Sequence, residues 1–280
     1  MATLKNTTIN DTGFIQLPVG TTAQRPASPA TGMMRVNTST SALEFYTGTS
    51  WTNIVASLPV TSGLVGWYLP DNYNSGTWTD ASGSGNNATL TTGTPTKSTH
   101  NGTNFGANST FTVVSGDTRA TGIQFPAAIL PSTYTLFHVS RYNLAIGVGG
   151  GQDVGRGRIF DGVTANWLSG FWNGGSGKAY HDGWLTESNT DYHGNYWVAN
   201  TDQNSRYRSK SKNANGGNWY NFTGGGGTSK QLSINYGNYT ANGANESSFW
   251  MVAEVVVYNR TLSDAEITLV ENYLTTKYGI

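Results

Sequence analysis

The sequence contains no cysteine, so its fold cannot depend on disulfide bonds. Secreted proteins often use disulfides for stability, whereas a chain that folds in a reducing cytosol has no need of them. The sequence also lacks an N-terminal hydrophobic signal region and any run of 18 apolar residues. We therefore expect a protein that is made in the cytoplasm and is neither exported through a signal peptide nor inserted into a membrane.

Charged residues are scarce as well, at 11% of the chain compared with roughly 25% in an average soluble domain. The 16 basic and 16 acidic residues cancel, and no basic stripe indicates nucleic acid as a partner. The one local cluster of cations has no acidic residue close to it in the sequence, and we interpret it as a solvated edge of a strand or loop. It contains Arg206, Arg208, Lys210 and Lys212.

Aromatic residues and glycine, in contrast, are abundant. Aromatic side chains make up 12% of the chain, with 9 tryptophans and 15 tyrosines, and glycine occurs 36 times. Disordered chains carry few aromatic residues. The composition instead predicts an all-β protein in which short strands are joined by many turns, with hydroxyl and amide side chains on the outside.

The segment from Met33 to Ile54 shows the alternation of a β-hairpin, with more aromatic surface than one thin ribbon can bury. An isolated two-stranded hairpin is marginally stable in water. We therefore expect this segment to be buried against copies of itself in an oligomer. The residues predicted to form that interface are Met34, Val36, Leu43, Phe45, Tyr46, Trp51 and Ile54.

The pattern divides the chain into three parts. Residues 1–32 form an extended apolar arm and a stiff, proline-containing connector, which we expect to dock onto another protein. Residues 33–57 form the hairpin module, and residues 62–280 form one large β domain. The alternative for the arm is a strand within this protein's own oligomer.

Strand candidates in the large domain come at short, turn-bounded intervals, which indicates a β-sandwich. The longest, Phe249–Tyr258, is almost continuously apolar and is typical of a central strand that is buried on both faces. Asp182-Gly183 lies between two apolar stretches and predicts a type I′ hairpin turn. The other candidates are Leu64–Leu69, Phe111–Val114, Tyr134–Arg141, Arg158–Asp161, Lys178–His181, Tyr196–Asn200 and Gln231–Ile234.

One helix is predicted near the C-terminus. Ser263 and Glu266 have the spacing of a capping box, and Gly279 marks the end of the helix. We expect this helix to pack across an edge or end of a sheet through a single apolar stripe. The stripe consists of Ile267, Val270 and Leu274.

Residues 1–55 resemble a module of bacteriophage tail fibres and virion structural proteins. The resemblance rests on TAQRPASPATGMMRVNT and on an E-Y-x-G-x-x-W pattern that is matched by Glu44, Tyr46, Gly48 and Trp51, with Phe45 at the variable position. It implies a homo-oligomer, in this family a trimer, that is anchored to other virion proteins through the arm. It also implies a location on the surface of a virion.

Residues 62–280 resemble the concanavalin A-like lectin/glucanase superfamily in its laminin-G-like form. The resemblance rests on LVGWYLPDNY with TWTDASGSGNNATL, on YTLFHVSRYN, on KAYHDGWL and on AEVVVYNRTLSDAEITLVENYLTTKYG. It implies a jelly-roll β-sandwich with a short closing helix. The superfamily includes lectins, hydrolases, adhesion modules and structural domains, so the function must be argued from the site.

No catalytic residues are predicted. The glutamates form no E-x-D-x-E strand motif, in which glucanases of this fold resemble one another, and the 4 histidines show no metal-ligand spacing. We therefore expect a protein that is not an enzyme and that needs no cofactor. Calcium at the turn beginning at Asp80 is one alternative, and an Asx turn that stabilises this loop is the other.

Carbohydrate binding is the ligand chemistry that the composition favours, because sugar rings stack on exposed aromatic side chains while neutral amides bind their hydroxyl groups. Two aromatic clusters are candidates for such a site, and burial in the core is the alternative for each ring. The candidate residues are Trp167, Trp172, His181, Asp182, Trp184, Tyr207, Trp219 and Tyr220.

Three functions are open at this point. The leading hypothesis is a non-enzymatic virion protein, a phage fibre or capsid decoration, whose lectin-like sandwich adheres to glycans on the host surface. The second is a purely structural decoration that binds no glycan, and the third is a spike that degrades polysaccharide. The first two differ in whether the candidate aromatic rings are exposed.

Overall fold

The computed structural model of the protein describes residues 13, 15–39, 42–53, 57–127, 129–144, 154–186, 195–211, 218–221, 230–237 and 245–280. Its contacts divide the chain into two compact units, Met1–Ser57 and Leu58–Ile280. The first 12 residues of the predicted arm, and Ile54 of the predicted interface, lie outside the described residues.

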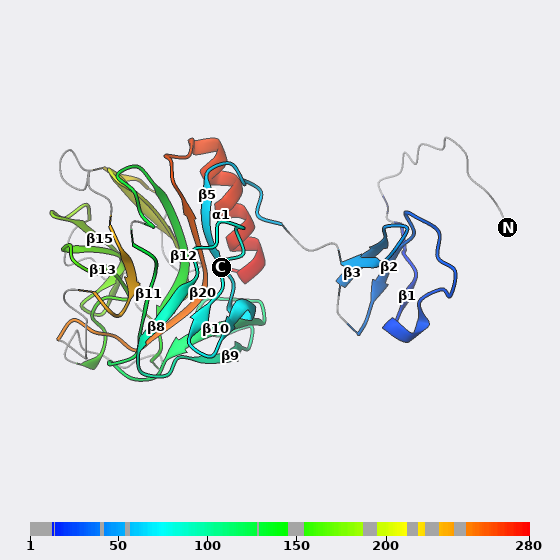
Figure 1. Cartoon of the computed structure of the whole chain (residues 1–280), viewed down its shortest axis with the longest axis horizontal. Coiled ribbons are helices and arrows are strands. Elements are labelled where there is room, and N and C mark those ends of the chain that lie inside the picture. Colours follow the sequence, from blue (N-terminus) through cyan, green and yellow to red (C-terminus); the bar gives the residue numbers. More distant parts are fainter. Residues whose placement is uncertain are drawn as a thin grey trace. The chain divides into compact units, whose positions relative to one another are not determined.

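The described residues of the first unit form a four-stranded sheet (Figure 1), so the two-stranded hairpin that we expected was too small. The chain reverses at Gly48, whose φ of 103° is a conformation that glycine adopts without strain, and β4 then pairs with β3. The connector is also less extended than predicted, because it begins with the 3-10 turn η1 (Thr22–Gln24). The strand order is β1 (Val19–Gly20), β2 (Met34–Asn37), β3 (Ala42–Tyr46) and β4 (Trp51–Asn53), with β1 parallel to β2.

The buried centre of the first unit is polar. Glu44 on β3 is fully buried, and its carboxylate accepts hydrogen bonds from Arg25 Nη2 at 2.6 Å and from Asn37 Nδ2 at 3.0 Å. Arg35 Nε lies 3.6 Å from the same carboxylate. The hydrogen bond from Arg25 is the main reason that the pKa of the Glu44 carboxyl is lowered.

The opposite face of this sheet is apolar. Because side chains alternate across a strand, the residue pairs Met34–Phe45 and Val36–Leu43 lie on the face away from Glu44. None of the described hydrophobic residues in the first unit is buried. We define the apolar face of the first unit as Val19, Met34, Val36, Leu43 and Phe45.

The second unit is a β-sandwich whose described residues form two eight-stranded antiparallel sheets, with the helix α1 (Asp264–Tyr278) against the outer side of one of them (Figure 1). We call the sheet that α1 covers the helix-side sheet and the other one the front sheet. This arrangement confirms the predicted all-β class, with a sandwich and one short C-terminal helix.

The helix-side sheet has the order β18 (Tyr220–Asn221), β17 (Arg206–Lys210), β16 (Val198–Gln203), β12 (Thr135–Tyr142), β20 (Trp250–Tyr258), β10 (Phe111–Gly116) and β9 (Thr96–His100), and β5 (Leu64–Tyr68) also pairs with β20. The front sheet has the order β15 (Gly175–His181), β14 (Trp167–Trp172), β13 (Phe160–Gly162), β19 (Leu232–Ile234), β11 (Gly122–Gln124), β8 (Ala88–Thr92), β7 (Thr77–Trp78) and β6 (Tyr73–Asn74). A 3-10 turn, η2 (Pro70–Asn72), follows β5.

The predicted central strand is confirmed as β20. It pairs with β12 along almost its whole length and with β10 and β5 on its other side. All of its residues from Val252 to Tyr258 are buried. Its continuous apolar sequence therefore reflects burial on both faces.

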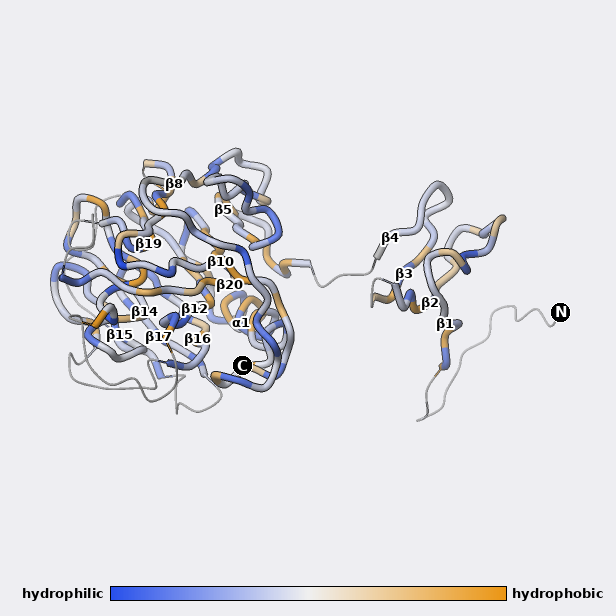
Figure 2. The backbone as a smooth tube through the Cα atoms, turned by 90° about the horizontal axis from the view of Figure 1, so that it is seen from below, coloured by the Kyte–Doolittle hydropathy of each residue, from blue (hydrophilic) through white to orange (hydrophobic). Residues whose placement is uncertain are grey.

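Two hydrophobic clusters fill the layers of the second unit. Trp167 and Trp250 belong to the cluster between the two sheets, and Phe137 and Trp197 pack with α1 in the cluster on the other side of the helix-side sheet. Figure 2 shows hydrophobic residues along β20 and α1. The helix-side sheet is thus covered by apolar side chains on both faces.

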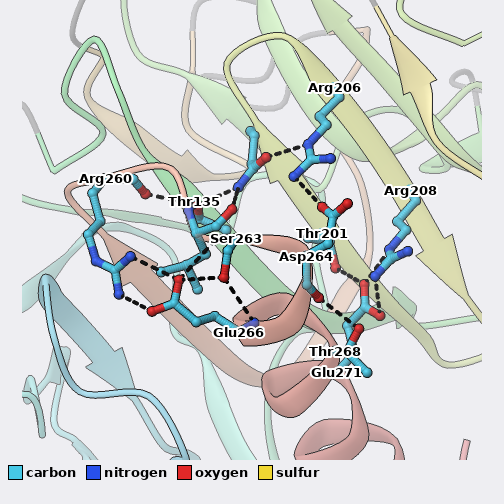
Figure 3. A network of polar contacts seen from close by, with 12 residues as sticks. Thr135, Thr201, Arg206, Arg208, Arg260, Ser263, Asp264, Glu266, Thr268 and Glu271 are labelled. Carbon is cyan, nitrogen blue, oxygen red and sulfur yellow. Dashed lines mark hydrogen bonds and ion pairs between the residues drawn. The ribbon is translucent and has the colours of Figure 1, made fainter.

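The predicted helix signals are confirmed in α1. Ser263 and Glu266 form the capping box, and Gly279 ends the helix in the left-handed conformation with φ 64°. Hydrogen bonds from Arg260 and from the Ser263 backbone lower the pKa of Glu266 to about 2 (Figure 3). The residues of the predicted apolar stripe are all buried, but they pack on the face of the helix-side sheet and not across an edge or end as we expected.

The cation cluster on β17 is not the solvated edge that we expected. Arg208 Nε lies 2.7 Å from the buried carboxylate of Glu271 on α1, and Arg206 pairs with Asp264 at 2.8 Å (Figure 3). Lys210 Nζ lies 2.6 Å from the same Glu271 carboxylate. The balancing acids come from a helix more than fifty residues later in the chain, so nearby sequence could not show them. Lys212 lies outside the described residues.

No helix in the described part of the chain is both long and apolar enough to cross a membrane.

Candidate functional site

The segment that carries most of the predicted sugar-binding residues forms β14 and β15, on the side of the second unit away from α1 (Figure 1). Trp167 and Phe171 point into the core between the sheets. Side chains alternate along a strand, so Trp172 faces outward from the front sheet. Leu168 and Trp172 are on the same, outward face of β14. Tyr180 on β15 lies opposite Leu168, so it is also on the outward face.

Three aromatic rings meet on this outward face. The ring centroid of Trp184 lies 5.1 Å from that of Trp172, at an interplanar angle of 62°, and 5.2 Å from that of Tyr180, at 79°. All three side chains are half-buried. We call Trp172, Tyr180 and Trp184 the aromatic cluster. Edge-to-face packing of this kind fixes the rings in place while leaving part of each accessible.

The turn between β15 and Trp184 holds the cluster together. Asp182 has a φ of 56°, and His181 N donates to Gly183 O at 2.8 Å, while Leu185 N donates to Ala179 O at 3.0 Å. The turn lies where the Asp-Gly pair predicted it, but the predicted type I′ is wrong. Only Asp182 takes the left-handed conformation, whereas type I′ needs it at both central residues. The Asp182 side chain is exposed at the turn.

Two predicted site residues, Trp167 and His181, are buried and stack on each other between the sheets, with ring centroids 5.6 Å apart. His181 Nε2 lies 3.2 Å from the carboxylate of Asp202, which also accepts a hydrogen bond from Tyr134 at 2.8 Å. Trp167 Nε1 donates to the Tyr134 hydroxyl at 3.1 Å. Because the rings are covered and their polar atoms satisfied internally, these two residues are corrected from site residues to core residues.

The second predicted cluster is divided between two faces of the helix-side sheet. Tyr207 is fully buried, and Tyr220, its partner across β17 and β18, packs with Leu185 in the same small hydrophobic cluster. Trp219 lies under the guanidinium groups of Arg206 and Arg208, 3.9 and 4.3 Å from its ring centroid. These aromatic residues therefore do not form one exposed surface, and core burial, the alternative for each ring, holds for Tyr207.

A buried polar group on the outward face of the front sheet was missed by the sequence reasoning. Lys178 lies two residues before Tyr180 on β15, so it shares the outward face, and only 2% of it is exposed. Further along the sheet, Ser233 Oγ donates to the buried Asp161 carboxylate at 2.6 Å. Because side chains two residues apart on a strand share a face, the sequence could have placed Lys178 beside Tyr180 and the cluster.

The turn considered for calcium uses its carboxylate for protein hydrogen bonds. Asp80 accepts from the backbone N–H groups of Trp67, Ser82 and Asn86 at 2.8 to 3.0 Å, and from the Ser82 hydroxyl at 2.8 Å. These hydrogen bonds form the Asx turn that we considered as the alternative to calcium binding. Among the described residues there is no group of three or more histidine or acidic side chains placed to hold a metal ion.

No family model matches this sequence, and no curated protein matches it. Solved structures with a similar fold include Trypanosoma rangeli sialidase in complex with sialic acid, at 16% identity and a TM-score of 0.47, covering 79% of this chain and 34% of that one. They also include domain 4 of a GH43 extracellular arabinanase from Geobacillus stearothermophilus with arabinotriose, at 13% identity and a TM-score of 0.44, covering 74% of this chain and 97% of that domain. A third is botulinum neurotoxin type C, whose cell entry depends on two ganglioside molecules. The match has 13% identity and a TM-score of 0.44, and it covers 79% of this chain and 54% of that one.

These structures are of carbohydrate-active or carbohydrate-binding proteins, and the likeness to them concerns the fold. This chain spans about a third of the length of the sialidase chain. The comparison corrects one prediction: we expected a protein that is not an enzyme, yet the similar structures include sialidases and a domain of an arabinanase.

Proposed function

We propose that this protein binds carbohydrate through the aromatic cluster on the front sheet. The observation that carries the proposal is the contact of Trp184 with both Trp172 and Tyr180, which joins three half-buried rings into one surface. The C–H faces of a sugar ring stack on such rings, and polar side chains around them bind the hydroxyl groups. Asp182, exposed at the turn between Tyr180 and Trp184, is the polar group that we assign to this second task.

The test is a glycan array probed with the fluorescently labelled protein, followed by titration of the best-bound glycan. Replacing Trp172 and Trp184 together by Ala should weaken binding at least tenfold, since stacking on both rings is lost. Trp219→Ala is the matched control, because Trp219 is also a half-buried tryptophan but packs on the other sheet. Equal loss in both variants, or no glycan bound by the native protein, would contradict the proposal and favour a purely structural role.

We further propose that the first unit attaches the sandwich to a larger particle, as in a bacteriophage tail fibre or capsid decoration, and that copies of the chain associate through it as a trimer. The resemblance of residues 1–55 to such modules motivates the proposal. The apolar face of the first unit supports it, since Val19 and Met34 are 61% and 42% exposed in the single chain. Exposed apolar side chains grouped on one face of a sheet are typical of an interface.

Two predicted interface residues lie elsewhere. Tyr46 and Trp51 pair across β3 and β4 on the same face as Glu44, with ring centroids 5.6 Å apart, and the Arg25 guanidinium lies 5.9 Å from the Trp51 ring. We therefore place the self-association surface on the apolar face alone. Three glycan sites held together by such a trimer would bind a cell surface through multivalency.

Light scattering coupled to size-exclusion chromatography tests this surface. The native chain should elute with three times the mass of one chain, and Phe45→Asp, which puts a charge on the apolar face, should elute as a monomer. Thr47→Asp is the control, because Thr47 is exposed in the neighbouring turn. A native protein that stays monomeric at high micromolar concentration would refute the oligomer.

A further inference from the structure

A cavity of about 260 Å³ lies beside the C-terminal end of α1, on the helix-side sheet. Three separate parts of the chain form it: η2 with the residue before it, the first two residues of β10, and the last two residues of α1. Pockets for drug-sized ligands measure roughly 300–1,000 Å³, so this cavity suits one small molecule. Its lining includes Leu69, Asp71, Phe111, Lys277 and Tyr278.

One wall of the cavity is apolar and fixed in place. The ring of Phe111 packs edge-to-face on Tyr278, with ring centroids 4.7 Å apart at an interplanar angle of 79°. Tyr278 is itself held by its hydroxyl, which donates to Glu254 Oε2 at 2.6 Å. Phe111 and Leu69 are half-buried, so part of each side chain remains accessible. This wall can pack against the C–H groups of a ligand.

Lys277 brings a hydrogen-bond donor to the cavity without adding a net charge. Its ammonium donates to Glu254 Oε2 at 2.7 Å and to the Tyr273 hydroxyl at 2.9 Å. An ammonium has three N–H groups, so one is left over. The Lys277 side chain is 31% exposed, whereas that of Glu254 is fully buried. The buried carboxylate therefore balances the positive charge, and the third N–H is accessible to a ligand hydroxyl group.

Asp71 adds a negative charge that nothing in the cavity balances. Its side chain is exposed, and it forms no ion pair with any residue that the structure describes. Burial, and then the charge of Glu254, raise the pKa of the Tyr278 hydroxyl, and the charge of Asp71 adds to this effect. Because Lys277 and Glu254 cancel, Asp71 gives the cavity a net negative charge, which attracts a cation.

We propose that this cavity binds a monosaccharide that carries a free amino group. The ammonium of the sugar pairs with Asp71, a sugar hydroxyl accepts a hydrogen bond from Lys277, and the C–H groups of the ring pack on Phe111 and Leu69. An N-acetylated sugar lacks the charge that Asp71 attracts, and an acidic sugar is repelled. The cavity and the aromatic cluster lie on different sheets, so either site can fail without the other.

The test is NMR titration of the full-length, ¹⁵N-labelled protein with D-glucosamine at pH 6, where the amino group of the sugar is protonated. N-acetyl-D-glucosamine serves as the uncharged sugar and methylamine as the bare cation. We expect glucosamine to shift the backbone amides of Asp71, Thr112 and Tyr278 in a saturable way. Both control ligands should bind there at least fivefold more weakly, since each lacks one of the two groups that the cavity contacts.

Asp71→Asn keeps the size of the side chain and removes its charge at an exposed position, and it should weaken glucosamine binding at least fivefold. Asp264→Asn is the matched control, because Asp264 is 70% exposed at the other end of α1. The proposal is overturned if glucosamine leaves the three amides in place, if either control ligand binds there as tightly as glucosamine, or if Asp71→Asn binds glucosamine as tightly as Asp264→Asn does.

Discussion

The two outer surfaces of the sandwich use the same kinds of side chain in different ways. On the helix-side sheet, Trp197 is fully buried in the cluster that α1 completes. On the front sheet, Trp172 and Trp184 contact each other and remain half-buried. The difference shows that an abundance of aromatic residues does not by itself identify a binding site. The layer in which a ring lies decides whether it stabilises the fold or is available to a ligand.

The largest expected effect comes from disrupting the covered surface. Val270→Asp places a charge in the buried stripe of α1, and we expect a loss of about 4 kcal/mol or more in the free energy of unfolding. The adjacent Leu269 is 52% exposed, so Leu269→Asp should change that free energy by no more than about 0.5 kcal/mol. Urea unfolding followed by tryptophan fluorescence measures both. Similar losses would mean that α1 does not bury Val270 as described.

A pair of tryptophan substitutions compares the two surfaces directly. Trp197→Ala should cost about 3–5 kcal/mol, as is usual for a fully buried large side chain. Trp172→Ala should cost about 1 kcal/mol, because it removes a ring contact at a half-buried position. The same urea experiment applies. If Trp172→Ala destabilises the protein as much as Trp197→Ala does, the aromatic cluster is core and our proposed site is wrong.

The last prediction concerns the polar interior between the two surfaces. His138 is fully buried among Ser140, Ser169 and Asn200, and burial lowers its pKa to about 3. The unfolded chain binds the proton near pH 6.5, so between pH 6.5 and 3 the unfolded state holds more protons. The free energy of unfolding must therefore fall as the pH is lowered, by up to about 1.4 kcal/mol per pH unit.

His138→Asn isolates this contribution. Its stability should depend less steeply on pH than that of the native protein between pH 6 and 4, by about 1.4 kcal/mol per pH unit. Denaturation curves at several pH values give the two slopes, whatever the absolute stability of the variant. Equal slopes would show that His138 is not held neutral in the folded protein.

Local signals predicted the elements of the fold well. The β20 strand and the cap of α1 follow from a few adjacent residues, because continuous apolar character and a capping box depend on nothing distant. The number of strands in the first unit did not follow, since β1 joins the sheet by pairing with β2 across the connector. Pairing between distant segments is not contained in the pattern of either one.

The candidate site was only partly predictable for a similar reason. Alternation along β14 separates Trp167 from Trp172, so the sequence could have assigned them to opposite faces. It could not show which face is inside, because that depends on contacts with the helix-side sheet. There, Tyr134 bonds to Trp167 and Asp202 bonds to His181. The predicted residues that we keep in the proposed site are Trp172, Asp182 and Trp184, which are half-buried or exposed.

The central claim is that the sugar stacks on Trp172 and Trp184, and fluorine NMR of protein labelled with 5-fluorotryptophan tests it most directly. Each of the 9 tryptophans gives one resonance, which a Trp→Phe substitution at that position assigns. Titration with the best-bound glycan should shift the resonances of Trp172 and Trp184 and leave those of the buried Trp167, Trp197 and Trp250 in place. A bound glycan that shifts Trp219, or none of the tryptophans, would contradict the account.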